Sequence, residues 1–171
     1  MILETKRLIL RRLVPTDLDD LYELYRDPEI RRYFPDGTRT YEQTADELAW
    51  FEHGHPRHPE LGLWATIDKE SGQFVGRSGL LPWSIAGRDE VEVAYMVAKP
   101  FWRQGLGSEV ARGLVEYGFG RLNLESLIAL IDPEHEASIR TALSAGMLFD
   151  FETVMEGLPT VVYRSSRPSA K

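Results

Sequence analysis

The sequence predicts an α+β fold, with a mixed, mostly antiparallel twisted sheet of about seven strands flanked by about four helices. Three observations carry this prediction. Apolar residues alternate with period two in several successive segments, apolar residues spaced by three and four mark helices between them, and residues 127–131 are wholly apolar. Strands joined by tight turns pair antiparallel, whereas a strand buried on both faces fits a parallel neighbour.

The N-terminal part of the chain predicts a strand, a helix and a loop. Residues 6–13 form the strand, and Thr16 is a favourable N-cap for a helix that ends at Asp27-Pro28. The loop that follows is rich in aromatic residues and proline over residues 33–37. The helix carries apolar residues along one side, namely Leu18, Leu21, Leu24 and Tyr25.

A second helix is predicted after Thr40, which forms a capping box with Gln43. A loop dense in histidine and proline follows over residues 53–61. No cysteine or ordered carboxylate spacing accompanies its histidines, so we interpret them as loop residues rather than metal ligands. The inward side of the helix is expected to contain Tyr41, Ala45, Leu48 and either Trp50 or Phe51.

The middle of the chain predicts a run of paired strands. Residues 63–68 and 74–81 form a hairpin that turns at residues 69–72, and the strand at residues 90–98 continues this meander. The apolar run at residues 127–131 is expected to lie parallel to that strand, because a helix of about a dozen residues separates them.

The C-terminal part predicts one more helix and two strands. Asp132 caps the helix, Pro133 starts it, and Gly146 ends it. The last strands are expected at residues 149–155 and 160–164, followed by a frayed tail at residues 165–171.

Length and composition indicate one enzyme-sized domain spanning residues 1–171. A chain of 171 residues can bury a substantial core, and the absence of cysteine excludes disulfides, thiolate metal sites and cysteine nucleophiles. The net charge of −7 argues against nucleic-acid binding through a basic surface. No apolar stretch is long enough to span a membrane and no apolar signal core follows the first charges, so we expect a cytoplasmic protein that does not bind membranes.

Two acidic clusters allow two interpretations. Such clusters are commonly solvated helix faces, but part of this charge can also attract a cationic amine or a basic partner. The residues are Asp17, Asp19, Asp20, Glu23 and Asp27, then Glu42, Asp46, Glu47 and Glu52.

The segment at residues 101–109 contains the most informative motif. It joins the strand at residues 90–98 to an amphipathic helix, and Gly105 and Gly107 let the backbone turn tightly at the helix start. The first amides of a helix lack intrahelical partners, so this junction predicts an anion cradle made of backbone. A plain turn is the alternative. A Walker loop is excluded because no Lys-Ser/Thr pair follows Gly107, and a dinucleotide fingerprint is excluded because Val110 replaces its third glycine.

The glycine motif resembles the acyl-coenzyme A loop of the GNAT N-acetyltransferases. Trp102 occupies the first position of the pattern, which departs from the general superfamily but is similar to its ribosomal-protein N-terminal branch, the RimJ/RimL-like proteins. The resemblance implies that backbone amides hold the coenzyme A pyrophosphate and that Ser108 adds a hydroxyl. The coenzyme-binding residues it implies are Val97, Arg103, Gln104, Gly105, Leu106, Gly107, Ser108, His135 and Ser138.

Three other segments resemble the same branch, at residues 5–13, 72–80 and 132–147. In the last, His135 and Met147 replace an Asn and a Phe that are common in the family. The resemblance also implies that the two central parallel strands splay apart and that the coenzyme arm enters the gap.

The resemblance implies transfer of an acetyl group from acetyl-coenzyme A to a primary amine, without a metal. The amine must lose a proton, and Glu92 is the candidate base, although a solvated strand residue is the alternative and Glu90 has the same parity. The Tyr that many members use as acid is missing, so Ser138 and Tyr95 are candidate substitutes. His135 fits coenzyme binding or helix capping better than acid catalysis.

The acceptor amine is left open between a protein N-terminus and a small molecule. By analogy with the family, loops at residues 31–38 and 83–89 would shape its pocket. A non-catalytic acyl-coenzyme A binding or sensor module is the alternative function, and pairing into a homodimer stays open.

Overall fold

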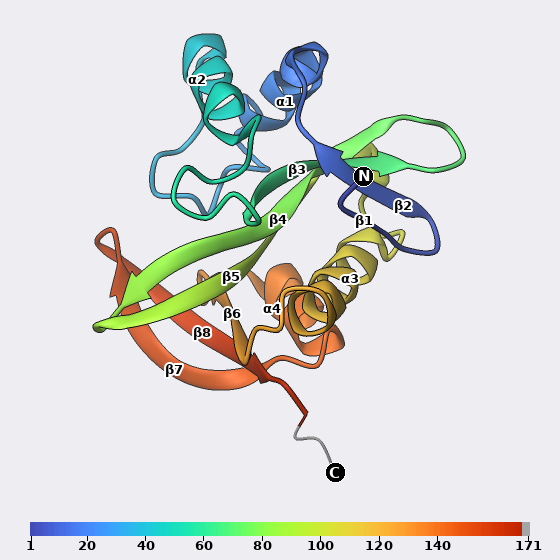
Figure 1. The fold of residues 1–171 in the computed structure, drawn as a ribbon. Helices are drawn as coiled ribbons and strands as arrows, with labels where there is room; N and C mark the ends of the chain where they lie inside the picture. The colour runs from blue at the N-terminus through green and yellow to red at the C-terminus, as the bar shows by residue number, and fades with distance from the viewer. Residues whose placement is uncertain (169–171) are drawn as a thin grey trace.

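The computed structural model describes residues 1–168, in which eight strands form one sheet (Figure 1). Their order across the sheet is β1-β2-β3-β4-β5-β6-β8-β7, and all neighbours are antiparallel except β5 and β6. The predicted mixed sheet is confirmed, and the short β1 is the strand that the sequence did not indicate. The strands are β1 (Leu3–Glu4), β2 (Leu8–Arg12), β3 (Gly62–Asp68), β4 (Phe74–Ile85), β5 (Arg88–Val97), β6 (Ser126–Ile131), β7 (Leu148–Met155) and β8 (Leu158–Ser166).

Helices cover both faces of the sheet (Figure 1). On one face lie α1 (Leu18–Tyr25) and α2 (Tyr41–Phe51), and on the other lie α3 (Leu106–Gly120) and α4 (Glu136–Ser144). The chain also forms short 3₁₀ helices, η1 (Pro15–Asp17) before α1 and η2 (Lys99–Phe101) before α3. None of the helices within residues 1–168 is long and apolar enough to cross a membrane.

The core consists mainly of two apolar layers, one on each face of the sheet. Val93 of β5 is buried in the layer under α3 and α4, while Ala94 and Met96 are buried in the layer under α1 and α2. Because side chains alternate along a strand, Glu92 faces the α1/α2 side and Tyr95 faces the α3/α4 side. The two faces of β5 therefore present different chemistry.

Two predicted helix starts are wrong. Thr16 lies within η1, because the Asp17 carboxylate accepts a hydrogen bond from the Val14 amide (2.9 Å) and closes that turn first. Asp132 likewise accepts from the Glu134 amide (2.8 Å), which closes a turn and delays α4 until after His135.

The predicted packing of α2 is correct at Leu48 and Phe51, whereas Ala45 is only half-buried and Tyr41 is exposed. The Thr40 capping box is present, and Leu48 and Phe51 are buried. Tyr41 and Trp50 are exposed, and the Tyr41 hydroxyl donates to Asp19 on α1 (2.9 Å) instead of entering the core.

The predicted frayed tail is wrong in its first part. Strand β8 continues through Ser166 beside β6, and the Arg167 amide donates to the Glu125 carbonyl (2.8 Å). Residues 169–171, the rest of the predicted tail, lie outside the described residues.

Candidate functional site: a glycine loop and a cavity between splayed strands

The glycine loop after β5 presents a row of free backbone amides. Arg103 and Gly105 have positive φ angles of 61° and 75°, which fold the loop back onto the first turn of α3. Within residues 1–168, none of the amides of residues 103–108 donates to a protein acceptor. Six consecutive donors at a helix N-terminus match the predicted anion cradle.

The loop is fixed by side chains from a distant part of the sequence. Arg7, just before β2, donates to the Gln104 carbonyl (2.9 Å) and forms an ion pair with Glu109 on α3 (2.7 Å). The Thr5 hydroxyl also donates to Glu109 (2.6 Å). The Trp102 indole donates to the Val97 carbonyl (2.6 Å), so this residue at the unusual first position of the motif anchors the loop to β5.

The space at Gly107 tests whether the loop has room for a ligand. A Cβ atom built on Gly107 meets nothing closer than 3.9 Å, where Val97 and Thr141 lie. Its φ angle is not positive, so neither packing nor backbone strain requires glycine there. An open approach to free amides fits a bound pyrophosphate. Leu106 offers only its backbone, because its side chain is buried in the core.

The central parallel strands separate beyond a single pair. Glu92 of β5 and Ile128 of β6 are the only Cα partners in their ladder within the described chain. The Ala98 amide donates to the Val75 carbonyl, which makes Gly76 and Val97 a non-hydrogen-bonded pair. The amide and carbonyl of Val97 therefore point away from β4. The carbonyl accepts from the Trp102 indole, and in the described chain the amide is free to pair with an extended ligand arm in the gap.

A cavity of about 450 Å³ lies where β5 and β6 separate. Its walls come from the segment between α1 and α2, from α2, from β3, β4, β5 and β6, from the start of α4, and from the turn between β7 and β8. This volume suits a small organic molecule. The cavity brings together four residues that the sequence singled out, namely Glu92, Tyr95, His135 and Ser138.

Glu92 is the carboxylate of this cavity whose environment suits a base. The Trp83 indole donates to its Oε2 (2.6 Å), and burial raises its pKa to about 7, although the Trp83 hydrogen bond and the Arg77 charge act to lower it. Glu90, of the same parity, has another role. Arg164 holds it with two hydrogen bonds (2.8 and 2.9 Å), so the structure separates the two candidates.

Tyr95 and Ser138, the two candidate substitutes for the missing acid, contact each other. The Tyr95 hydroxyl donates to the Ser138 carbonyl (3.0 Å) and lies 3.0 Å from its Oγ. Burial raises the pKa of Tyr95 to about 12, so the phenol stays protonated at neutral pH. The contact joins β5 to the first turn of α4 across the gap.

His135 links the two sides of the cavity. Its ring stacks on Tyr33, from the segment between α1 and α2, at a centroid distance of 4.3 Å and an interplanar angle of 17°. It occupies the N-cap position of α4, but its side chain caps no amide. Burial lowers its pKa, which favours the neutral ring.

The two loops predicted to shape the acceptor pocket contribute unequally to the cavity. Tyr33, Phe34 and Asp36 line it from the first loop, but from the second only Trp83 does. The turn between β7 and β8, which the sequence did not indicate as part of a site, lines the remaining side with Met155 and Leu158.

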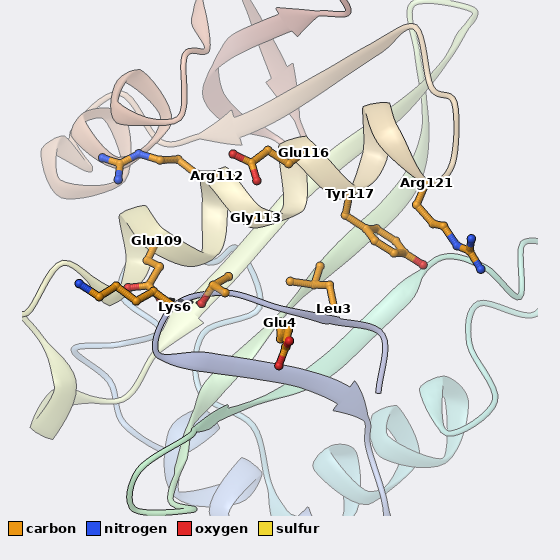
Figure 2. A pocket seen from close by; sticks show the side chains of 10 residues that line it. Leu3, Glu4, Lys6, Glu109, Arg112, Gly113, Glu116, Tyr117 and Arg121 are labelled. Carbon is orange, nitrogen blue, oxygen red and sulfur yellow. Dashed lines mark hydrogen bonds between the residues drawn. The ribbon is translucent and has the colours of Figure 1, made fainter.

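A second hollow lies on the outer side of α3 (Figure 2). It is bounded by Leu3 and Glu4 of β1, by Arg112 and Glu116 on successive turns of α3, and by Arg121 just after the helix. It contains none of the candidate catalytic residues. Within residues 1–168, no group of three or more His, Asp or Glu side chains is arranged to hold a metal ion.

Comparisons with known proteins match this geometry. Residues 7–148 match the family model described as acetyltransferase (GNAT) domain. The chain is 32% identical to the Bacillus subtilis protein YkkB, over 94% of this chain and 93% of that protein. It is 27% identical to the N-acetyltransferase p20 of Bacillus licheniformis, over 88% and 86% of the two chains. The aminoglycoside acetyltransferase AAC(6')-Ib, solved with coenzyme A, has a similar fold, with a TM-score of 0.73 at 17% identity over 94% and 95% of the chains.

Proposed function

Because the chain belongs to the GNAT acetyltransferase family and is therefore an acetyl-coenzyme A-dependent enzyme, we propose that it acetylates a small primary amine bound in the cavity beside Glu92. The observation that carries the proposal is the position of Glu92. It lies at the last pair between β5 and β6, where the cavity and the gap between the strands meet.

The glycine loop would hold the pyrophosphate of the co-substrate. The free amides of residues 103–108 supply the donors, and the Ser108 hydroxyl adds one more. The backbone amide of Val97 would pair with the extended arm, which directs the thioester toward Glu92 and Tyr95. His135, on the opposite wall of the cavity, would contact the arm from α4.

Glu92 would accept the proton that the acceptor ammonium must lose before its nitrogen can attack the thioester carbon. A carboxylate with a pKa of about 7 is ionised in a large fraction of molecules at neutral pH, and it is more basic than an exposed Glu. As the carbon–nitrogen bond forms and the carbon–sulfur bond breaks, the nitrogen loses a second proton and the sulfur leaves as a thiolate. The thiolate takes up one proton through water, so that the products are the amide, the free thiol and the proton that Glu92 accepted.

The Tyr95 hydroxyl would stabilise the negative charge that develops during this transfer. With a pKa of about 12, it is suited to donating a hydrogen bond rather than to giving up its proton to a thiolate. For this, the Tyr95 O–H would turn from the Ser138 carbonyl to the developing charge, while the Ser138 hydroxyl donates to the phenol oxygen and holds it in place, as a positioning residue.

The similarity of the loop and N-terminal strand to the ribosomal-protein N-terminal branch supports descent from that branch, but the cavity favours a small acceptor over a protein N-terminus. Its walls come from many separate segments, and the turn between β7 and β8 closes part of it with Met155, Glu156 and Leu158. The cytoplasmic location and the homodimer stay predictions.

The experiment is release of free thiol from acetyl-coenzyme A, followed colorimetrically across a panel of small amines and short peptides. We expect turnover with small amines that exceeds turnover with peptides. Tight coenzyme binding without turnover of any acceptor would contradict the proposal and favour the non-catalytic binding module.

A further inference from the structure

One buried cation in the cavity has no anionic partner. Arg77 of β4 is 6% exposed and lines the cavity wall. Its Nε donates to the Tyr25 hydroxyl (2.9 Å), and within residues 1–168 its guanidinium makes no other hydrogen bond. In the described chain, every side-chain nitrogen or oxygen that is sealed from solvent has a hydrogen-bond partner. The two Nη atoms of Arg77 have none there, so they are not sealed and are open to the cavity that Arg77 lines.

The neighbouring charges are already matched with one another. Arg31 pairs with Asp36, and Arg39 pairs with both Asp36 and Glu47. No acidic side chain of residues 1–168 forms an ion pair with Arg77. Its hydrogen-bond partner Tyr25 stays neutral, because burial raises the pKa of this phenol, and the phenol donates to Glu47. The charge of Glu47 therefore acts on Arg77 across Tyr25 and satisfies none of its Nη hydrogens.

Stacking explains where Arg77 lies but does not satisfy its donors. The guanidinium carbon lies 5.6 Å from the ring centroid of Tyr25 and 5.8 Å from that of Phe34. Aromatic faces attract a cation, yet they accept none of the four Nη hydrogens in the plane of the group. A buried charge is costly unless it is paired and hydrogen-bonded. The protein therefore leaves room beside Arg77 for an anion whose oxygens accept from the Nη atoms.

Arg77 and Glu92 face the same cavity from adjacent strands. Arg77 is opposite Met96, and Leu81 is opposite Glu92, so the two residues lie on one face about four residues apart along the strands. This separates their Cα atoms by roughly 13 Å. Both side chains are long enough to narrow that distance, and each charge influences the pKa of the other.

We propose that the acceptor is a small amino-carboxylate whose carboxylate binds Arg77 while its amine lies beside Glu92. This inference rests on the proposed function and names its substrate class. The apolar and aromatic wall residues Phe51, Leu63, Leu81 and Trp83 fit an apolar body between the two charged ends. Arg77 would repel a second cationic group at its end of the cavity. Of the carboxylates that line the cavity, Asp36 and Glu47 are paired with arginines and Glu92 is the proposed base, while Asp132 and Glu156 come from the end of β6 and from the β7–β8 turn rather than from β4.

The test compares acceptors with and without a carboxylate, and acceptors with different spacings between the amine and the carboxylate. Amino acids with apolar side chains, their amides, and the straight-chain series from β-alanine to 5-aminovalerate are assayed by thiol release from the wild-type enzyme. We expect a 10- to 100-fold higher kcat/KM for an acid than for its amide, with an optimum at one chain length. Equal values for acid and amide throughout the series would overturn the proposal.

Variants then assign the preference to one side chain. Arg77→Gln is expected to remove the preference by lowering kcat/KM for the acids far more than for the amides. Because the Arg77 charge also lowers the pKa of Glu92, the ratio of acid to amide is compared within each enzyme at a pH above the acid limb of the pH–rate profile. Arg26→Gln is the matched control, because Arg26 is exposed on the surface after α1, outside the cavity, and should retain the preference. A retained preference in folded Arg77→Gln enzyme would contradict the assignment. If that variant does not fold, Arg77→Lys is tested instead. Lysine keeps the positive charge but cannot donate two parallel hydrogen bonds to one carboxylate, so this variant is expected to retain part of the preference.

Binding of the products separates this inference from the proposed function. Calorimetry of N-acetyl amino acids against the wild-type protein saturated with coenzyme A needs no turnover. Tighter binding of the N-acetyl acid than of its amide supports the carboxylate site even if no amine in the panel is acetylated, whereas failure of acetylation counts against the proposed function. Equal binding, or no binding of either compound, overturns the Arg77 assignment.

Discussion

The indole of Trp83 donates a hydrogen bond to the carboxylate of Glu92 over 2.6 Å, across adjacent strands of the sheet. Burial and this hydrogen bond act on the same carboxyl group in opposite directions. Burial dominates and raises the pKa of Glu92 to about 7, while the indole favours the ionised form that a base requires. Trp83 therefore tunes Glu92 and also fixes the direction of its oxygen atoms.

Replacing Glu92 with Gln should lower kcat by roughly 10²- to 10⁴-fold, because the amide cannot accept the ammonium proton. The wild-type kcat/KM should fall as the pH drops below about 7, where Glu92 becomes protonated. This fall in kcat/KM due to Glu92 should be missing in the variant. Only the pH dependence caused by protonation of the acceptor amine should remain. Coenzyme affinity should change little, and near-normal turnover at pH 7 would show that Glu92 is not the base.

Replacing Trp83 with Phe should move the acid limb of the pH–rate profile to higher pH. The change removes the hydrogen bond that stabilises the carboxylate, so the pKa of Glu92 rises further above 7. Trp50→Phe is the matched control, because Trp50 is 57% exposed on α2. An unshifted limb in Trp83→Phe enzyme would mean that the limb belongs to another group.

Glu92 should also make the folded protein less stable as the pH rises. The pKa is 4.5 in an ordinary setting and about 7 in the fold, so between these values the folded state binds more protons and its stability decreases. Relative to wild type, Glu92→Gln should therefore gain roughly 2 kcal/mol of unfolding free energy between pH 5 and pH 9. Urea unfolding at the two pH values measures this, and a constant difference would contradict the raised pKa.

Local patterns in the sequence were sufficient for most of the fold. Alternation along residues 90–98 predicts β5, the apolar run predicts its parallel neighbour β6, and the Thr40 capping box predicts the start of α2. The errors occur where a side chain forms a local hydrogen bond that competes with the helix. Asp17 and Asp132 each accept from a nearby amide and shift a helix start by a few residues.

The candidate site was less predictable because much of it depends on long-range contacts. Glycine spacing indicates the cradle. No local signal shows that Arg7 donates a hydrogen bond to the Gln104 carbonyl of this loop, 97 residues away in the sequence. Strand parity predicts the side that Glu92 faces, yet it cannot distinguish Glu92 from Glu90. The distinction depends on Arg164, which β8 brings beside Glu90.

Tyr95 and Ser138 should behave as one unit in a double-mutant cycle. Tyr95→Phe removes the proposed donor and should lower kcat roughly 10- to 100-fold, whereas Ser138→Ala, which only loosens the phenol, should have a smaller effect. The double variant should be no slower than Tyr95→Phe, because a positioning residue has no effect once the group it positions is gone. Additive losses would mean that Ser138 acts independently. Ser144→Ala, at the far end of α4, is the control.

Replacing Gly107 with Val should abolish coenzyme binding while leaving the protein folded. The Cβ position of Gly107 has no protein atom within 3.9 Å, so the fold can accept a side chain that would nonetheless fill the approach to the amides of residues 103–108. Calorimetry should show at least a 100-fold weaker Kd for coenzyme A, with a melting temperature close to that of wild type. Gly120→Val is the matched control, because Gly120 is at the other end of α3 with no atom within 4 Å of its Cβ position. Normal affinity in folded Gly107→Val protein would show that the glycine loop is a plain turn.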